Sequence, residues 1–215
     1  MWLTRYSSQR QDTHRSTCPP AKLRNAAYRI CYSRFANIEW IMALKPQDIF
    51  VVLKIVANGS RRAPYTELAD TLGMSASEAH ASVQRAVQSH LLHGPEMQHR
   101  PNPVALEEFL VHGLRYAFPA EHGEFTRGVA TSYAAEPLRK LIARGNDPIP
   151  VWPSVEGKER GVAFSPLYRT APIAALRDPA FYEFLALADA LRDGRARERK
   201  IAEGELHKRL GNANA

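Results

Sequence analysis

Between residues 43 and about 90, apolar residues recur at the spacing of α-helices. The stretch 48–57 (DIFVVLKIVA) is almost wholly apolar and lies between Pro46 and the pair Asn58-Gly59. This arrangement predicts a short buried helix, although its β-branched residues would also suit a strand. A second short helix is predicted over 65–72 (YTELADTL), where three apolar residues share one face: Leu68, Ala69 and Leu72.

A start signal for a third helix follows a tight turn at Gly73-Met74. Ser75 and Glu78 have the spacing of a capping box, in which each side chain accepts a hydrogen bond from the backbone of the other. We therefore expect a helix that runs from Ala76 to about Ser89. Its apolar face points inward and consists of Ala79, Val83, Ala86 and Val87.

The second half of the chain alternates between clear helix signals and an ambiguous stretch. A helix is predicted over 103–116, within a connecting region at 96–118. Residues 119–175 carry recurrent Pro and Gly, with apolar residues only in twos and threes, and are interpreted as a long irregular segment that could hold a short hairpin.

Two further helices are predicted at the C-terminal end, within residues 176–215. Asp178-Pro179 is a strong start signal for a helix to Asp193. Its apolar stripe makes residues 179–193 our candidate for a dimer interface, although the helix could equally pack on the body of the chain. A charged helix is expected over 195–210, and its basic run 192–200 is interpreted as a solvated face rather than a phosphate-binding one.

The first 41 residues differ from the rest. They hold both cysteines (Cys18 and Cys31) and supply +5 of the formal net charge of +7, so the remaining chain is only weakly basic. Three interpretations compete: a secretory signal, for which an apolar run is missing; a transit peptide; and translated sequence upstream of a natural start at Met42. We favour the last and expect a flexible leader. Without it the chain has no cysteine, which favours a reducing cytoplasm.

The segment 67–86 (ELADTLGMSASEAHASVQRA) carries the one constellation with recognisable chemistry. A small residue at Ala69, a glycine at Gly73 and apolar residues at Ala79 and Val83 have the spacing at which two short helices cross around a tight turn. This pattern resembles winged helix-turn-helix regulators of the MarR and AsnC type over about residues 48–95. The resemblance departs from the family after Leu91-Leu92, where 94–103 is short and rich in proline, so we expect a reduced or absent wing.

The resemblance implies that the helix 76–89 lies in the major groove of DNA. Its outward side chains would then contact base edges, with Gln84 suited to adenine and Arg85 to guanine or a phosphate. Phosphate contacts are expected from the start of this helix and from the arginines before the first motif helix. The predicted DNA-binding residues are Arg61, Arg62, Ser75, Ser77, His80, Ala81, Gln84 and Arg85.

The remaining candidate chemistry is weak. His90, His93 and His99 have no partner spacing typical of a metal site and are interpreted as solvated. The glycines and serines of the second half match neither a phosphate-binding loop nor a nucleophile elbow. We therefore expect no metal, no cofactor and no enzyme.

The sequence thus predicts a mainly α-helical protein: a helix-turn-helix domain (42–95) followed by a helical C-terminal region with a long irregular segment. The expected function is a cytoplasmic, sequence-specific transcriptional regulator that occludes a promoter on double-stranded DNA as a homodimer. Acidic residues near the motif (Glu67, Asp70 and Glu78) dilute its positive field and favour a purely structural role for the motif. The alternative function is an antitoxin-like module that masks a protein partner through residues 119–210 and could also repress its own promoter.

Overall fold

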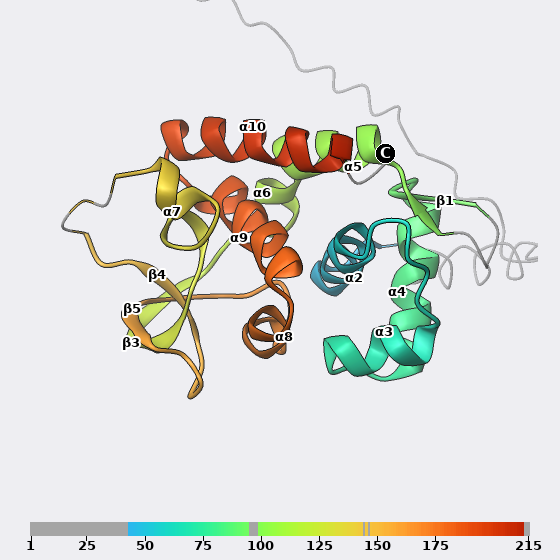
Figure 1. Cartoon of the computed structure of the whole chain (residues 1–215), viewed down its shortest axis with the longest axis horizontal. Coiled ribbons are helices and arrows are strands. Elements are labelled where there is room, and N and C mark those ends of the chain that lie inside the picture. The colour runs from blue at the N-terminus through green and yellow to red at the C-terminus, as the bar shows by residue number, and fades with distance from the viewer. Residues whose placement is uncertain (1–42, 95–98, 144, 146, 213–215) are drawn as a thin grey trace, which may run out of the picture. The chain divides into compact units, whose positions relative to one another are not determined.

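A computed structural model describes residues 43–94, 99–143, 145 and 147–212 (Figure 1). The predicted leader, residues 1–41, lies outside this part of the chain. The described chain is mainly helical with two small sheets. Its elements are α2 (Pro46–Ala57), α3 (Tyr65–Leu72), α4 (Ala76–Gln88), β1 (Leu92–His93), β2 (Arg100–Pro101), α5 (Pro103–Glu108), a π-helical turn (Phe109–Gly113), α6 (Leu114–Ala117), β3 (His122–Ala130), a 3₁₀ turn (Ser132–Ala134), α7 (Leu138–Leu141), β4 (Pro150–Pro153), β5 (Glu159–Phe164), α8 (Ala171–Arg177), α9 (Pro179–Asp193) and α10 (Ala196–Asn212).

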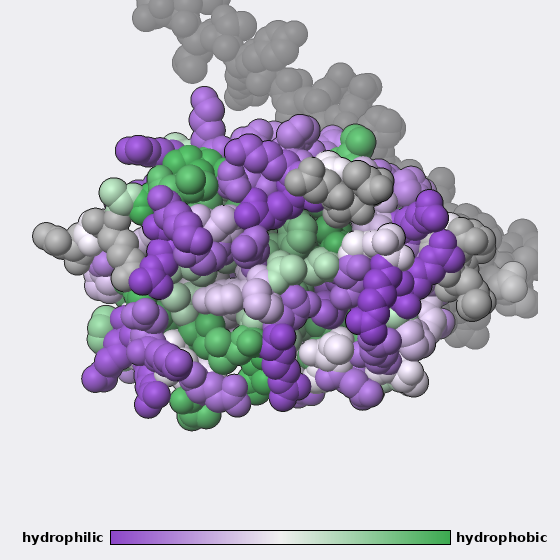
Figure 2. All heavy atoms as spheres, viewed as in Figure 1, coloured by the Kyte–Doolittle hydropathy of each residue, from purple (hydrophilic) through white to green (hydrophobic). Residues whose placement is uncertain are grey.

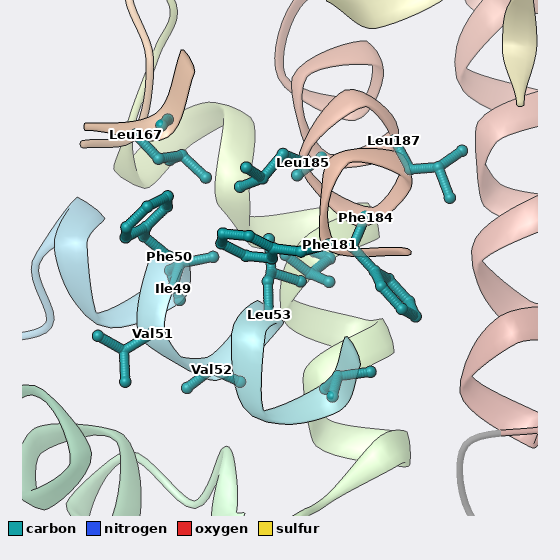
Figure 3. Close-up of a cluster of buried hydrophobic side chains, with 14 of the residues drawn as sticks. Ile49, Phe50, Val51, Val52, Leu53, Leu167, Phe181, Phe184, Leu185 and Leu187 are labelled. Atoms are coloured by element: carbon teal, nitrogen blue, oxygen red, sulfur yellow. The ribbon is translucent and has the colours of Figure 1, made fainter. Parts of the chain in front are cut away.

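Helix α2 is the predicted apolar helix, and it is buried on nearly all sides. Every residue from Ile49 to Leu53 is fully buried, because α2 contacts both α4 and α9. Figure 3 shows Phe50 of α2 lying close to Phe181 of α9, and their ring centroids are 5.1 Å apart. A helix enclosed in this way shows no polar face, which explains why its sequence could also be interpreted as a strand.

Helices α3 and α4 have the predicted boundaries and the predicted turn between them. Gly73 ends α3 in the left-handed conformation, with φ of 64°, which a residue with a side chain resists. Ser75 caps α4, and the reciprocal hydrogen bonds with Glu78 are both present. These local predictions are confirmed.

A very short hairpin follows α4. Strands β1 and β2 pair antiparallel, with Leu92 opposite Pro101 and His93 opposite Arg100. A proline has no amide hydrogen to donate, which limits the ladder at that end. The region where the sequence predicted a reduced or absent wing thus contains a strand pair of two residues each, and residues 95–98 between the strands lie outside the described chain.

The interpretation of 119–175 as an irregular segment is wrong. Strands β3, β4 and β5 pair with one another and close into a small barrel. The pairs β3–β4 and β3–β5 are antiparallel, and β4–β5 is parallel. These strands could not be predicted from the sequence pattern. Strand β3, for example, is exposed along its first half and buried only at its end, so its apolar and polar residues do not alternate regularly.

Glycines allow the barrel strands to approach one another. A Cβ atom on Gly128 would lie 2.0 Å from the carbonyl oxygen of Trp152, and one on Gly161 would lie 1.9 Å from that of Ile149. No side chain fits at those distances. The recurrent glycines that suggested a loop therefore mark the points where the strands of the barrel lie closest together.

Helix α9 is the central helix of the C-terminal half, and the prediction that it forms a dimer interface is wrong. Its residues from Phe184 to Arg192 are all buried, because α9 contacts α10, α8, α6 and α2 within the same chain. The second possibility considered for it, packing on the body, is the observed one. Asp178 caps its first turn as predicted, accepting a hydrogen bond from the amide of Phe181 at 3.1 Å.

Figure 2 shows one face on which hydrophilic residues predominate and apolar residues form separate groups between them. None of the helices in the described ranges is both long and apolar enough to span a bilayer.

Candidate nucleic-acid interface

Helix α4 presents two contrasting faces. Ala79, Val83 and Ala86 are buried, since α4 packs against α2 and α3. On the other side Ser77 and His80 are exposed, and Ala81 and Gln84 are half-buried. The outward orientation predicted for these four residues agrees with the structure.

Arg85 does not belong to the outward face, and the prediction that it points toward a ligand is wrong. Its side chain is only 11% exposed. Its Nε and one terminal nitrogen donate to the two carboxylate oxygens of Asp48, at 2.8 and 2.6 Å, and the terminal nitrogen also contacts the hydroxyl of Ser82 at 3.2 Å. This bidentate pair ties α4 to the first turn of α2.

The start of α4 is held by a compact set of hydrogen bonds. The amide of Glu78 donates to Oγ of Ser75 at 3.2 Å, and the amide of Ser75 donates to Oε2 of Glu78 at 2.9 Å. The backbone and hydroxyl donors of Ser75 hold the pKa of Glu78 below its ordinary value, and the nearby charge of Arg169 contributes in the same direction. Glu78 is therefore a fixed negative charge at the helix start.

The two arginines before α3 differ in their surroundings. Arg61 forms an ion pair with Glu67, the acidic residue of the first turn of α3. Arg62 is exposed, and no ion pair joins it to a carboxylate of the described chain. Of the pair predicted to contact a phosphate, Arg62 is thus the one whose charge is available.

Three aromatic rings, from α3, α4 and the residue before β2, lie in contact, and no pattern in the sequence indicates this contact. Tyr65 lies edge-on to His80, with centroids 5.0 Å apart, and its hydroxyl is 2.6 Å from Nε2 of His99. His99 is half-buried, so its interpretation as a solvated histidine is wrong. No spacing rule links positions 65, 80 and 99, because only the tertiary fold brings them together.

The neighbouring acidic residues are partly compensated by basic ones. Arg61 neutralises Glu67, and Arg169 lies within electrostatic range of Glu78. Asp70 lines a cavity of about 390 Å³ together with Lys54 and Arg177. The pair Arg61–Glu67 leaves the net charge of the motif unchanged, so the dilution of the positive field expected from the sequence is weaker only at Glu78, where Arg169 comes from outside the motif.

The described part of the chain contains no group of three His, Cys, Asp or Glu side chains that could hold a metal ion. The exposed face of α4, the start of that helix and the hairpin beside it form instead a polar surface of hydroxyl, amide and imidazole groups. Such groups donate to and accept from the edges of bases.

Comparison with known proteins gives no family model that matches the chain, and no significant match among curated proteins or solved structures. The function therefore has to be argued from this surface itself.

Proposed function

We propose that the chain is a sequence-specific DNA-binding protein in which α3 and α4 act as a helix-turn-helix. The observation that carries the proposal is the division of α4 into a buried apolar face and an outward face of Ser77, His80 and Gln84, directly after a glycine turn and a capped start. A helix held on one side and polar on the other can enter the major groove without disturbing its own packing.

The proposed docking places the outward face of α4, from Ser77 to Gln84, against base edges. Gln84 would bind adenine through its amide, and the small Ala81 would contact a thymine methyl group. Ser77 and His80 would lie beside them. Arg62 and the first amides of α4, at Ala76 and Ser77, would contact phosphates and set the position of the helix, since the amide of Ser75 already donates to Glu78. Arg85 has no part in this interface because Asp48 occupies its guanidinium.

The short hairpin β1–β2 would flank the groove on the other side. His93 and Arg100 are both exposed and oppose each other across the pair. Either side chain can donate to a phosphate. The proposal includes regulation of transcription by occlusion of a promoter, but it assigns no dimer interface to α9, which is buried within the chain.

The alternative function, masking of a protein partner, has lost its main argument. That argument depended on 119–175 being an irregular segment available for contacts. Since these residues form the barrel and its flanking turns, the alternative stays a prediction that no observation favours.

The test is a selection of duplexes from a random library by the full chain, followed by fluorescence anisotropy on the enriched duplex and on a scrambled one. We expect selective, salt-sensitive binding, and a loss of discrimination of about 1–3 kcal/mol in Gln84→Ala. The matched control is Gln88→Ala, which alters the same face one turn later, beyond the residues proposed to contact bases. Equal and weak binding of both duplexes by the unaltered chain would overturn the proposal.

A further inference from the structure

We infer that the segment Tyr168–Thr170, from the C-terminal half of the chain, completes the DNA interface, with Arg169 binding a backbone phosphate next to the start of α4. This inference rests on the proposed function and extends it to a residue far from the motif in sequence. The segment connects β5 to α8.

The segment is fixed against the turn between α3 and α4. The hydroxyl of Thr170 donates to the carbonyl oxygen of Leu72 at 2.5 Å. A Cβ atom built on Gly73 would lie 3.1 Å from the methyl carbon of Thr170. The C-terminal half therefore touches the very turn on which the motif depends.

The residue before Arg169 fixes the segment from a second direction. The ring of Tyr168 packs against that of Phe50 in α2, with centroids 5.4 Å apart. The same side chain lies near enough to Glu78 to help lower the pKa of that carboxyl. The backbone at Arg169 is thus held on both sides, so that little ordering of the backbone is required when Arg169 binds a ligand.

Arg169 itself is exposed, and its charge is available. It forms no ion pair with a carboxylate of the described chain, and its guanidinium carbon lies 5.7 Å from the centre of the Tyr168 ring. An arginine in this state can form two hydrogen bonds to a phosphate.

The charge of Glu78 explains why such a residue is needed. A phosphate that approaches the amides at the start of α4 meets this ionised carboxylate, which repels it. Arg169 lies within electrostatic range of the same carboxylate, so it offsets the repulsion at that point. The polar start of α4 and the basic side chain from the C-terminal half therefore form one phosphate-binding surface.

The experiment uses the full chain and compares Arg169→Gln with Arg160→Gln. Both changes remove one positive charge from an exposed arginine, but Arg160 lies on β5 of the barrel, against Phe125. Affinity for the enriched and the scrambled duplex is measured by anisotropy across a salt series. We expect Arg169→Gln to weaken both complexes about threefold to fivefold and to reduce the slope of log K against log salt by about 0.9. Arg160→Gln should change neither quantity, and Arg169→Lys should retain most of the slope.

The outcomes separate the two proposals. If the unaltered chain binds DNA selectively and Arg169→Gln leaves affinity and slope unchanged, the inference is wrong while the proposed function stands. Tighter binding by Arg169→Gln would also overturn it, because the segment would then obstruct the groove. If the unaltered chain shows no selective binding, the proposed function itself fails.

Discussion

At the scale of single residues, the pairing of Asp48 with Arg85 decides what α4 can offer to a ligand. From the sequence, Arg85 belongs with the polar positions of its helix and looks like a base-reading residue. In the fold its guanidinium lies within the core beside a fully buried carboxylate. A buried ion pair contributes little compared with apolar packing, but removal of one partner leaves an uncompensated charge.

We therefore expect Arg85→Met to destabilise the chain by about 3–5 kcal/mol, since Asp48 would remain buried without its partner. The double variant Asp48→Leu with Arg85→Met should regain most of this loss. The measurement is the free energy of unfolding in urea for Arg85→Met, for Asp48→Leu and for the double variant. A small change in the free energy of unfolding for Arg85→Met, together with a weaker salt dependence of DNA binding, would indicate that Arg85 contacts DNA.

At the scale of elements, the capping residue of α4 has two separable roles. Ser75 stabilises the helix as its cap, and in the proposed function its neighbourhood receives a phosphate. Aspartate caps helices as well as serine does, but it adds a negative charge.

Ser75→Ala is expected to lower the free energy of unfolding by about 0.5–2 kcal/mol. Ser75→Asp retains a capping acceptor but loses the hydroxyl that donates to Glu78 and places a second carboxylate beside it, so it should not be more stable than the unaltered chain. It should bind DNA more weakly than Ser75→Ala, because its carboxylate repels the phosphate. Thermal unfolding and anisotropy on the same preparations measure both effects. Unimpaired DNA binding by Ser75→Asp would argue against a phosphate at this position.

The barrel provides a second prediction at this scale. Gly128→Ala should destabilise the chain by more than about 2 kcal/mol, because the new methyl group would overlap the backbone of β4. Gly204→Ala is the matched control: it lies within α10, has open space around it, and should stabilise the chain by up to about 1 kcal/mol. Equal stability of the two variants in urea would show that the strands do not approach as closely as described.

At the scale of the whole molecule, polar groups on α9 connect it to the rest of the chain. Asp189 is fully buried and accepts hydrogen bonds from the indole of Trp152 and the hydroxyl of Thr131, at 2.8 and 2.7 Å. Arg192 pairs with Asp189 and donates to the carbonyl oxygens of Phe118 and Ser165. At the other end of α9, Asp178 is paired with Lys54 of α2 at 2.5 Å.

The Asp178–Lys54 pair predicts a specific dependence of stability on pH. Burial alone would raise the pKa of Asp178, but the hydrogen bonds from Lys54 and from the amide of Phe181 and the charge of Lys54 outweigh it, so that the pKa lies below its ordinary value. A carboxyl with a lowered pKa in the folded state contributes stability that is present above its unfolded pKa of about 4 and is lost as the pH falls through the folded value.

The difference in unfolding free energy between the unaltered chain and Asp178→Asn should therefore be constant from pH 7 to about pH 5 and shrink below about pH 4. Urea denaturation across this range measures it. Asp147→Asn is the control, because its ion pair with Arg195 is exposed and contributes little. A difference that persists unchanged at pH 2 would mean that the charge of Asp178 is not what stabilises the contact.

The sequence by itself determined the features that depend on neighbouring residues. The boundaries of α3, the capping box at Ser75, the left-handed turn at Gly73 and the cap at Asp178 all follow from interactions within four residues, and each is present in the fold. The outward positions of Ser77, His80 and Gln84 follow from the same helical periodicity.

The tertiary structure alone decided the features that depend on distant partners. Arg85 is buried because Asp48, 37 residues away, lies opposite it, and Arg192 is buried although its neighbours in the basic run suggest a solvated face. The strands of the barrel take their positions from one another rather than from an alternating pattern. Thr170 contacts the turn before α4 only because the C-terminal half packs on that turn. Contacts of this kind produce no regular pattern of apolar and polar residues in the sequence, because the two partners lie far apart along the chain.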